Sequence, residues 1–368
     1  MKFKKYRIIK ISLLTLLGII LILFSFGYWF ISLLPPVEKN LESSVVLDLP
    51  YLSENVVDSK GKILAVVTSV DVMGDSGKST GYELTELSRA YYVFKANGFE
   101  VDVASPLGGK PTVVIDDEDM GVFDYAFLND EEAQHKVSNT IAMKNVIKED
   151  YDAVYFVGGK GAMYDFPNNK HIQDLVRNYY ETDKVIGAVC HGPAALVNIT
   201  LANKRPLIEN KRISCFTNKE ELLLISEARS IFPFLLEDKI TEQGAKFEEG
   251  EMYLEKICHD KNIITGQNPW STWALAETMI KQLGHTPKHR VITGEENAVK
   301  VLSVYRSEGE DKAKELIKSM INNDKPLKRQ LIASHSIVSV MKGEMGGFID
   351  MIELTSYAKS CEEEREKI

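Results

Sequence analysis

The feature that most constrains the fold is a regular alternation of short apolar segments with longer amphipathic ones between residues 61 and 284. Runs of β-branched and small residues predict strands at Lys62–Val70, Glu100–Ala104, Tyr151–Val157, Lys184–Val189, Arg212–Phe216 and Ile263–Gln267. Apolar residues at helical spacing predict helices at Tyr82–Asn97, Asn169–Thr182 and Trp270–Leu283. Strands that alternate with helices form a mostly parallel sheet covered on both faces, with ligands bound at the carboxyl ends of the strands.

Cys190 occupies a sharp corner between a predicted strand and a helix that Gly192 and Pro193 begin. A turn of this kind raises one side chain above the sheet, and the N-terminus of a helix favours thiolate over thiol. The alternative is a small hydrophobic cysteine buried in the core. The polar His191 and the helix-starting Gly-Pro pair have no packing reason to follow a core cysteine, and so they favour a reactive thiol.

Two further loops of the predicted sheet open on the same edge. Gly158, Gly159 and Gly161 form a glycine-rich run that lacks the spacing of phosphate-binding and dinucleotide-binding loops. We expect this run to present backbone N–H to an oxyanion hole, together with the N–H of His191. Glu83 and Glu86 follow the first strand and share one helix face, and one of them is expected to be solvated.

The N-terminal segment predicts a membrane span, because residues 11–34 contain no charged side chain and are long enough to cross a bilayer. Five basic residues precede it, so the positive-inside rule places the N-terminus in the cytoplasm and the remaining chain outside. A cleaved signal peptide is the competing interpretation. It is disfavoured by the length of the run and by Tyr28, Trp29 and Phe30 near its end, where a cleavage site needs small residues.

Composition excludes some partners. A net charge of -9 argues against nucleic acid, whose phosphates such a chain repels. Cys190, Cys215, Cys258 and Cys361 form no CxxC pair, which argues against a disulfide framework or a zinc knuckle. Beyond Gly284 the pattern is entirely helical, with segments predicted at Glu295–Glu308, Asp311–Asn322, Pro326–Met341 and Phe348–Lys367.

Five segments, in order along the chain, resemble the DJ-1/PfpI superfamily and in particular its Hsp31-like, glyoxalase III branch. They are STGYELTELSRAYYVFKANGFEVDVASPLGG, DYDAVYFVGGKGAMYDFPNN, VIGAVCHGPAAL, RPLIENKRISCFTNKEE and ITGQNPWST. The resemblance implies a flavodoxin-like α/β sandwich with a nucleophile at Cys190, an adjacent His191 and a third triad carboxylate at Glu221. It also places Glu86 against the cysteine sulfur and leaves Glu83 as a bystander.

The implied reaction is the conversion of methylglyoxal or a related α-oxoaldehyde to a hydroxy acid, through a hemithioacetal on Cys190 and without a cofactor. This is a glyoxalase III-like lyase of the D-lactate dehydratase type. We expect a resting thiolate beside a protonated Glu86, because the two groups share one proton. His191, oriented by Glu221, then serves as general acid and base.

The expected organisation is a basic cytoplasmic segment (1–10), a transmembrane helix (11–34), a stalk (35–60), the α/β domain (61–284) and a helical extension (285–368). We expect no metal. Residues 107–130 contain no histidine, and the carboxylates at 116–119 lack the alternating spacing of a calcium loop. The resemblance allows a homodimer. Because the positive-inside rule puts the site outside the cell, three functions stay open: the glyoxalase, a membrane-tethered holdase chaperone or redox stress sensor, and a cysteine peptidase or hydrolase.

Overall fold

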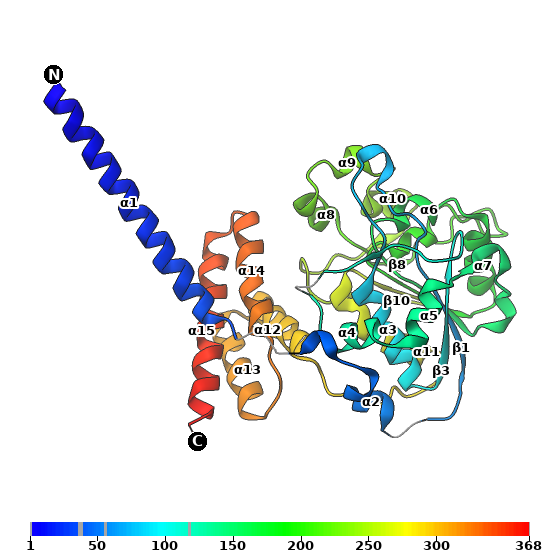
Figure 1. Cartoon of the computed structure of the whole chain (residues 1–368). Helices are drawn as coiled ribbons and strands as arrows, with labels where there is room; N and C mark the ends of the chain where they lie inside the picture. The colour runs from blue at the N-terminus through cyan, green and yellow to red at the C-terminus, as the bar shows by residue number, and fades with distance from the viewer. Residues whose placement is uncertain (1, 36–39, 55–56, 117–118, 368) are drawn as a thin grey trace. The chain divides into compact units, whose positions relative to one another are not determined.

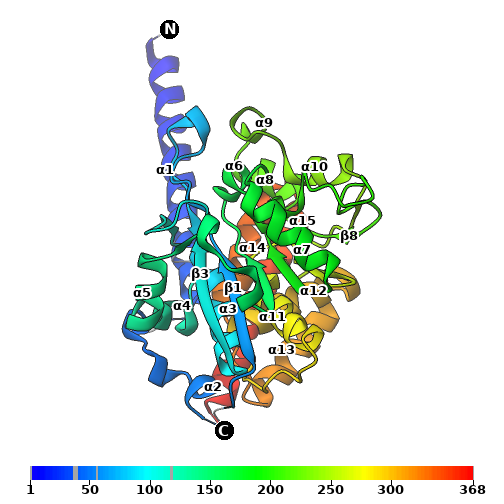
Figure 2. The same cartoon turned by 90° about the vertical axis from the view of Figure 1, so that its right-hand side faces the viewer.

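The computed structural model describes residues 2–35, 40–54, 57–116 and 119–367. It divides into two compact units, one formed by residues 1–38 and 292–368 and the other by residues 39–291. We call them the helical unit and the α/β unit. Figures 1 and 2 show the elements of each.

The α/β unit is built on a seven-stranded sheet with the strand order β10-β11-β7-β6-β1-β3-β5. All neighbours pair in parallel except β10, which runs antiparallel to β11. The strands are β1 (Gly61–Val66), β3 (Phe99–Ser105), β5 (Ile141–Ala142), β6 (Ala153–Phe156), β7 (Val185–Val189), β10 (Ile257–Asp260) and β11 (Ile263–Gly266). The predicted α/β class with a mostly parallel sheet is therefore confirmed.

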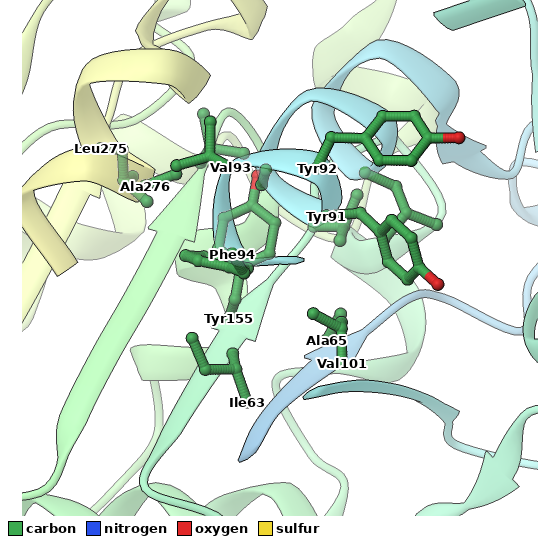
Figure 3. Packing of buried hydrophobic residues seen from close by; sticks show 14 of the residues in the cluster. Ile63, Ala65, Tyr91, Tyr92, Val93, Phe94, Val101, Tyr155, Leu275 and Ala276 are labelled. Carbon is green, nitrogen blue, oxygen red and sulfur yellow. The ribbon is translucent and has the colours of Figure 1, made fainter. Parts of the chain in front are cut away.

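Side chains of the central strands alternate between two hydrophobic cores, one on each face of the sheet. In β1, Ile63 and Ala65 belong to one core, whereas Leu64 and Val66 belong to the other. Both faces are buried because helices cover each of them, which explains why these strands are apolar throughout. Figure 3 shows the first core, where Tyr91–Phe94 of a covering helix pack with strand residues and with Leu275 and Ala276.

The helices of the α/β unit are α2 (Pro50–Ser53), α3 (Leu84–Ala96), α4 (Val122–Leu128), α5 (Glu131–Ser138), α6 (Ala162–Asp165), α7 (Lys170–Glu181), α8 (Asn218–Leu224), α9 (Ala228–Ile231), α10 (Leu236–Glu242) and α11 (Thr272–Gln282). Three of them, α3, α7 and α11, agree with the predicted ones within a few residues, and the structure adds seven that were not predicted. Asn169 caps α7, because its side-chain oxygen accepts hydrogen bonds from the N–H of His171 and Ile172. The sequence alone predicted this start.

Arg212–Phe216, which we expected in the main sheet, lies elsewhere. Only Arg212–Ile213 (β8) is a strand, and it pairs with β9 (Lys246–Phe247) in a separate two-stranded sheet. Its continuation is held against the main sheet by two hydrogen bonds, from Ser214 N to Thr265 Oγ1 and from Phe216 N to the Cys190 carbonyl. A second small sheet pairs β2 (Tyr82–Glu83) with β4 (Val113–Val114). Its backbone carries the chain from Gly81 into α3.

Residues 41–53, within the expected stalk, form short helices in the α/β unit, and Leu49 and Tyr51 are buried in its first core. Residues 36–39 and 55–56 of that stretch lie outside the described residues.

The helical unit contains α1 (Lys2–Leu33), α12 (Gly294–Glu308), α13 (Glu310–Asn322), α14 (Arg329–Met341) and α15 (Met345–Arg365). The predicted C-terminal helices are thus confirmed. By length and composition the part of α1 from Leu13 to Leu33 can cross a membrane, a property that signal sequences share.

Candidate active site

Cys190 lies one residue beyond β7 in a left-handed backbone conformation, with φ at 58°. A non-glycine residue adopts this conformation only where its surroundings fix it. Here the Cys190 N–H donates to the Gly266 carbonyl, and the Cys190 carbonyl accepts from Phe216 N, both at 2.9 Å. Two segments distant in sequence therefore hold the corner, and the thiol is only 5% exposed.

His191 connects the thiol to a carboxylate. Its Nδ1 lies 3.3 Å from Cys190 Sγ, and its Nε2 lies 2.6 Å from Glu221 Oε2. All three side chains are buried. Burial raises the pKa of Glu221, but the charge and hydrogen bond of His191 outweigh this and lower its pKa below the usual value. Glu221 is thus an acceptor for the Nε2 proton of His191, and Nδ1 is the ring nitrogen that faces the thiol.

Glu221 lies in the first turn of α8, and a capping box fixes the residue at which this helix begins. Thr217 Oγ1 accepts from Glu220 N at 3.1 Å, and Glu220 Oε2 accepts from Thr217 N at 3.0 Å. The other oxygen of Glu220 accepts hydrogen bonds from Gln267 and Asn268, which follow β11. Sequence reasoning did not identify this network, which ties the α8 start to the main sheet.

Glu86 lies in the first turn of α3 and is fully buried beside Cys190. Its Oε2 accepts a hydrogen bond from Gly158 N at 2.7 Å. Its Oε1 is buried without a hydrogen-bond partner in the described part of the chain. Gly158 lies between the two reactive groups, because a Cβ there would be 2.4 Å from Glu86 Oε2 and 2.8 Å from Cys190 Cβ. The structure thus brings Glu86, Cys190, His191 and Glu221 together.

Burial raises the pKa of Glu86 well above its usual range, and the nearby Glu83 carboxyl raises it further. Burial thus favours the protonated form of the Glu86 carboxyl. Burial also raises the pKa of the Cys190 thiol, and so does the negative charge that Glu86 carries when ionised. The surroundings therefore raise the thiol pKa where a fall was expected, and the resting thiolate stays a prediction.

The helix after Cys190 explains part of this difference. The sequence predicted an α-helix whose N-terminus stabilises a thiolate. The structure has a 3-10 helix of five residues, Gly192–Leu196, which ends at Val197. So short a helix has little dipole to offer.

Two charged side chains near the site were not identified from the sequence. Glu83, expected to be a bystander, is largely buried, and burial raises its pKa to about 7. The positive charge of Lys160, inside the glycine run, acts on Glu83, Cys190 and Glu221. No hydrogen bond or ion pair within the described residues uses the Lys160 ammonium group. A lysine within the loop that faces the reactive cysteine was the signal that sequence reasoning overlooked.

The expected oxyanion donors differ in their availability. The N–H of Gly158 is occupied by Glu86. Gly161 accommodates the loop after β1, since a Cβ there would be 2.7 Å from the Thr68 methyl group. Within the described residues, no hydrogen bond uses the N–H of Gly159 or of His191. These two donors therefore remain available for a developing oxyanion.

Aromatic side chains surround His191. Its ring contacts Phe216, with ring centroids 4.9 Å apart, and Phe232 at 6.4 Å. Phe232 also lines, with Tyr164 and Gly74–Ser76, a hollow of about 420 Å³, to which none of the four site side chains contributes.

Metal ligands are not gathered in the described part of the chain, where no group of three or more His, Cys, Asp or Glu side chains could hold an ion. Asp117 and Glu118 of the acidic run lie outside the described residues. The absence of a metal therefore stays a prediction.

Comparisons with known proteins concern the part of the chain that carries this site. A sequence model of the DJ-1/PfpI family matches residues 78–282. Glyoxalase 3 of Candida albicans is 32% identical over 232 residues, which cover 60% of this chain and 97% of that protein. The glutathione-independent glyoxalase HSP31 of Saccharomyces cerevisiae is 30% identical over 233 residues, covering 60% of this chain and 98% of its own length.

Two solved structures extend the comparison. Rapid Encystment Protein 24 KDa of Francisella tularensis has a TM-score of 0.57 at 36% identity, and the match covers 61% of this chain and 99% of that one. Glyoxalase III of Candida albicans has a TM-score of 0.55 at 27% identity, with 60% and 97% covered. Both matches span nearly the whole of the compared protein and leave a large part of this chain unmatched.

Proposed function

We propose, from the premise that this chain belongs to the DJ-1/PfpI family, that it is a glutathione-independent glyoxalase acting on methylglyoxal or a related α-oxoaldehyde. The curated relatives with full-length matches bear that name. The strand order of the sheet, in which β3, β1, β6, β7 and β11 are neighbours, supports a flavodoxin-like sandwich. The observation that carries the proposal is the contact of the Cys190 thiol with a histidine whose second nitrogen is held by Glu221.

In the first step Cys190 Sγ attacks the aldehyde carbon. The carbon–sulfur bond forms, the carbonyl π bond breaks, and the thiol proton passes through His191 Nδ1 to the new hydroxyl oxygen. The N–H groups of Gly159 and His191 stabilise the developing oxyanion, at about 3 kcal/mol for each donor. The product is a hemithioacetal with an unchanged ketone group.

The second step moves hydrogen from one carbon to its neighbour. His191 Nδ1 removes the hydrogen from the former aldehyde carbon, while protonated Glu86 gives its proton to the ketone oxygen, which yields an enediol. Protonated His191 then adds a proton to the neighbouring carbon, and Glu86 takes one back from the other oxygen. The result is a thioester of the 2-hydroxy acid, with both residues restored.

In the third step water attacks the thioester carbon, the carbon–sulfur bond breaks, one water proton passes through His191 to the Cys190 sulfur, and the hydroxy acid leaves. The sum is the addition of one water to the oxoaldehyde, so the reaction consumes no oxidant or reductant. The unpartnered Glu86 Oε1 supports this role, because a buried carboxyl oxygen without a partner is costly unless a substrate completes it.

We propose that α1 anchors this enzyme in a membrane. The segment Leu13–Leu33 is long and apolar enough to do so. The basic residues before it place the N-terminus in the cytoplasm and the α/β unit outside. If α1 is instead a cleaved signal, N-terminal sequencing of the mature protein will find a start near residue 40, and alkaline carbonate will extract the protein from membranes.

The function is tested on the full chain purified in detergent, by following the conversion of methylglyoxal to lactate. We expect Cys190→Ser to abolish the activity and Glu86→Gln to reduce it strongly, whereas Cys361→Ser, at a buried cysteine of the helical unit, leaves it unchanged. A Cys190→Ser variant with full activity overturns the mechanism. If the folded wild-type protein converts no α-oxoaldehyde, the holdase, sensor and peptidase alternatives become the leading hypotheses.

A further inference from the structure

The helical unit has one apolar end. Ile337, Val340 and Met341 near the end of α14, and Met345 and Ile349 at the start of α15, are about half exposed or more. Apart from Ile292, all other exposed large hydrophobic residues that the structure describes in this unit lie on α1. We call these five residues the apolar tip. Isolated exposed apolar residues are ordinary, but a cluster at the end of a helical hairpin is typical of an interaction surface.

The end of α1 is fixed to the two helices that carry the tip. Arg329, at the start of α14, donates to the Leu33 carbonyl. Lys359 of α15 donates to the Ser32 carbonyl at 2.8 Å. These cations satisfy carbonyl groups that a helix leaves unpaired at its C-terminus. Leu33 is buried as a result.

A ring contact gives the direction. Phe26 of α1 and Phe348 of α15 have ring centroids 6.4 Å apart. Along α1, Phe26 precedes Ser32, and along α15 its partner Phe348 precedes Lys359. The two helices are therefore parallel, and the start of α15 lies on the side of the α1 N-terminus. Figure 1 shows the α14–α15 hairpin next to the C-terminal part of α1, with the turn of the hairpin on the side of the α1 N-terminus.

The level of the tip along α1 follows from helix geometry. From Arg329, at the level of Leu33, α14 rises for twelve residues to Met341, which at about 1.5 Å per residue is roughly 18 Å. The same rise along α1 leads from Leu33 back to about Leu21. The tip thus lies at the level of α1 between Leu21 and Phe26, within about two helix turns of Tyr28 and Trp29. These aromatic residues stand near the outer end of the apolar segment, where such side chains mark a membrane interface.

We propose that the apolar tip inserts into the phospholipid bilayer beside α1, at the boundary between headgroups and acyl chains. The inference rests on the proposed membrane anchoring by α1. When α1 spans the bilayer, the tip is carried to the membrane surface or below it, where exposed apolar side chains are favoured. We take the bilayer as the partner that covers the tip, because the tip continues the exposed apolar surface of α1. The neighbouring helices α12 and α13 expose no large hydrophobic residue that the structure describes.

The turn between α14 and α15 limits the depth. Lys342 and Glu344 form an ion pair at 2.7 Å within this turn. Burying an ion pair among acyl chains costs free energy, whereas the polar headgroup region solvates it. The tip is therefore a shallow second contact, which fixes the orientation of the helical unit on the membrane in a way that a single span cannot.

The experiment uses the full chain reconstituted in phosphatidylcholine vesicles. The fluorophore NBD is attached at Met345→Cys on the tip, at Ile22→Cys on α1 and, as a matched control, at Ser319→Cys on the exposed face of α13. The labelled wild type is the blank for the native cysteines, which are buried. Quenching is compared between lipids that carry a doxyl group near the headgroup and lipids that carry it deep in the acyl chain.

We expect the label at 345 to be quenched at least about two-fold more by the shallow doxyl group than by the deep one, as an interfacial position requires. The label at 22 should be quenched, and the label at 319 should not. A double variant, Met345→Glu with Ile349→Glu, should abolish the quenching of a label at Ile337→Cys without changing that at 22.

Three results overturn the proposal. If the label at residue 22 is quenched and the label at residue 345 is not, α1 spans the bilayer but the tip does not insert. If neither is quenched, α1 does not span the bilayer and the proposal falls with the anchoring. A tip label shielded from both water and lipid, and cross-linked to a second copy of the chain, also overturns it, because the tip is then a protein interface.

Discussion

A single methyl group at residue 158 tests the proposed site most directly. In Gly158→Ala the new Cβ would lie 2.4 Å from Glu86 Oε2, 2.8 Å from Cys190 Cβ and 2.8 Å from the Val189 carbonyl. Ordinary contact with a Cβ begins at 3.4 Å, so the Glu86 carboxyl must move by the difference of 1.0 Å. A displacement of about 1 Å at a reacting group costs on the order of 10²-fold in rate.

The same movement stretches or breaks the hydrogen bond from Gly158 N to Glu86, which costs about 1–3 kcal/mol when a buried group loses its partner. We therefore expect kcat/KM with methylglyoxal to fall by about 10²-fold and the free energy of unfolding to fall by about 1–3 kcal/mol. Lactate formation and urea unfolding are the two assays.

The control is Gly187→Ala in β7. Its Cβ would meet Met279 Sδ at 2.2 Å, in the core and away from Glu86. This variant should lose a similar amount of stability and keep most of its activity, because a flexible methionine absorbs the added volume. If Gly158→Ala keeps kcat/KM within about three-fold of the wild type, Glu86 is not a reacting group and the mechanism is wrong.

Three further predictions concern proton positions. Glu221→Gln turns an acceptor into a donor toward His191 Nε2, so the imidazole proton moves to Nδ1 and the thiol loses its base. We expect kcat/KM to fall by about 10³–10⁴-fold. Alkylation of Cys190 by iodoacetamide should become slower as well. Burial raises the pKa of Glu83 to about 7, so the folded chain holds a proton that the unfolded chain loses near its ordinary value. Wild-type stability should therefore fall as pH rises through this window, while Glu83→Gln should be more stable at pH 8 by about 1–3 kcal/mol in urea unfolding. Burial lowers the pKa of His335 to about 4, so stability should be lost as pH falls from about 6.5 to 4, by up to roughly 3 kcal/mol, and His335→Leu should lack this loss. A wild type and a Leu variant with parallel pH curves would contradict the assignment to His335.

The local pattern of the sequence was enough to predict most elements. Helix α7 begins at an Asn cap, and strands β1, β6 and β7 are apolar on both faces because both faces are covered. For Arg212–Phe216 the local pattern did not predict the correct sheet. Its residues suit a strand, but its partner β9 comes about thirty residues later, and pairing over such a distance is decided by tertiary packing.

The candidate site divides in the same way. Cys190, His191 and the glycine run are visible as local motifs, and Glu86 and Glu221 were assigned by resemblance. The charge states were not predictable, because the burial of Glu83 depends on the pairing of β2 with β4 and on the approach of the Gly158 loop. The thiol pKa was expected to fall because of the helix N-terminus and the proton shared with Glu86, whereas the structure has a short 3-10 helix and a buried thiol there.

The side of the membrane on which the site lies decides which aldehydes it can meet, and the sequence predicts it by charge alone. Lys2, Lys4, Lys5, Arg7 and Lys10 precede the span, whereas both signs of charge follow it, so the α/β unit should lie outside. A membrane-impermeant maleimide should therefore label Lys170→Cys, at the exposed start of α7, in intact cells.

A cysteine in place of Lys5 should react with the maleimide only after the cells are permeabilised. The buried native cysteines should remain unlabelled in both conditions. The reverse pattern would place the α/β unit in the cytoplasm, where α-oxoaldehydes arise as metabolic by-products. It would also show that the basic segment does not set the topology. Because the chemistry of Cys190 is the same on either side, this result changes the biological substrate pool and leaves the mechanism untouched.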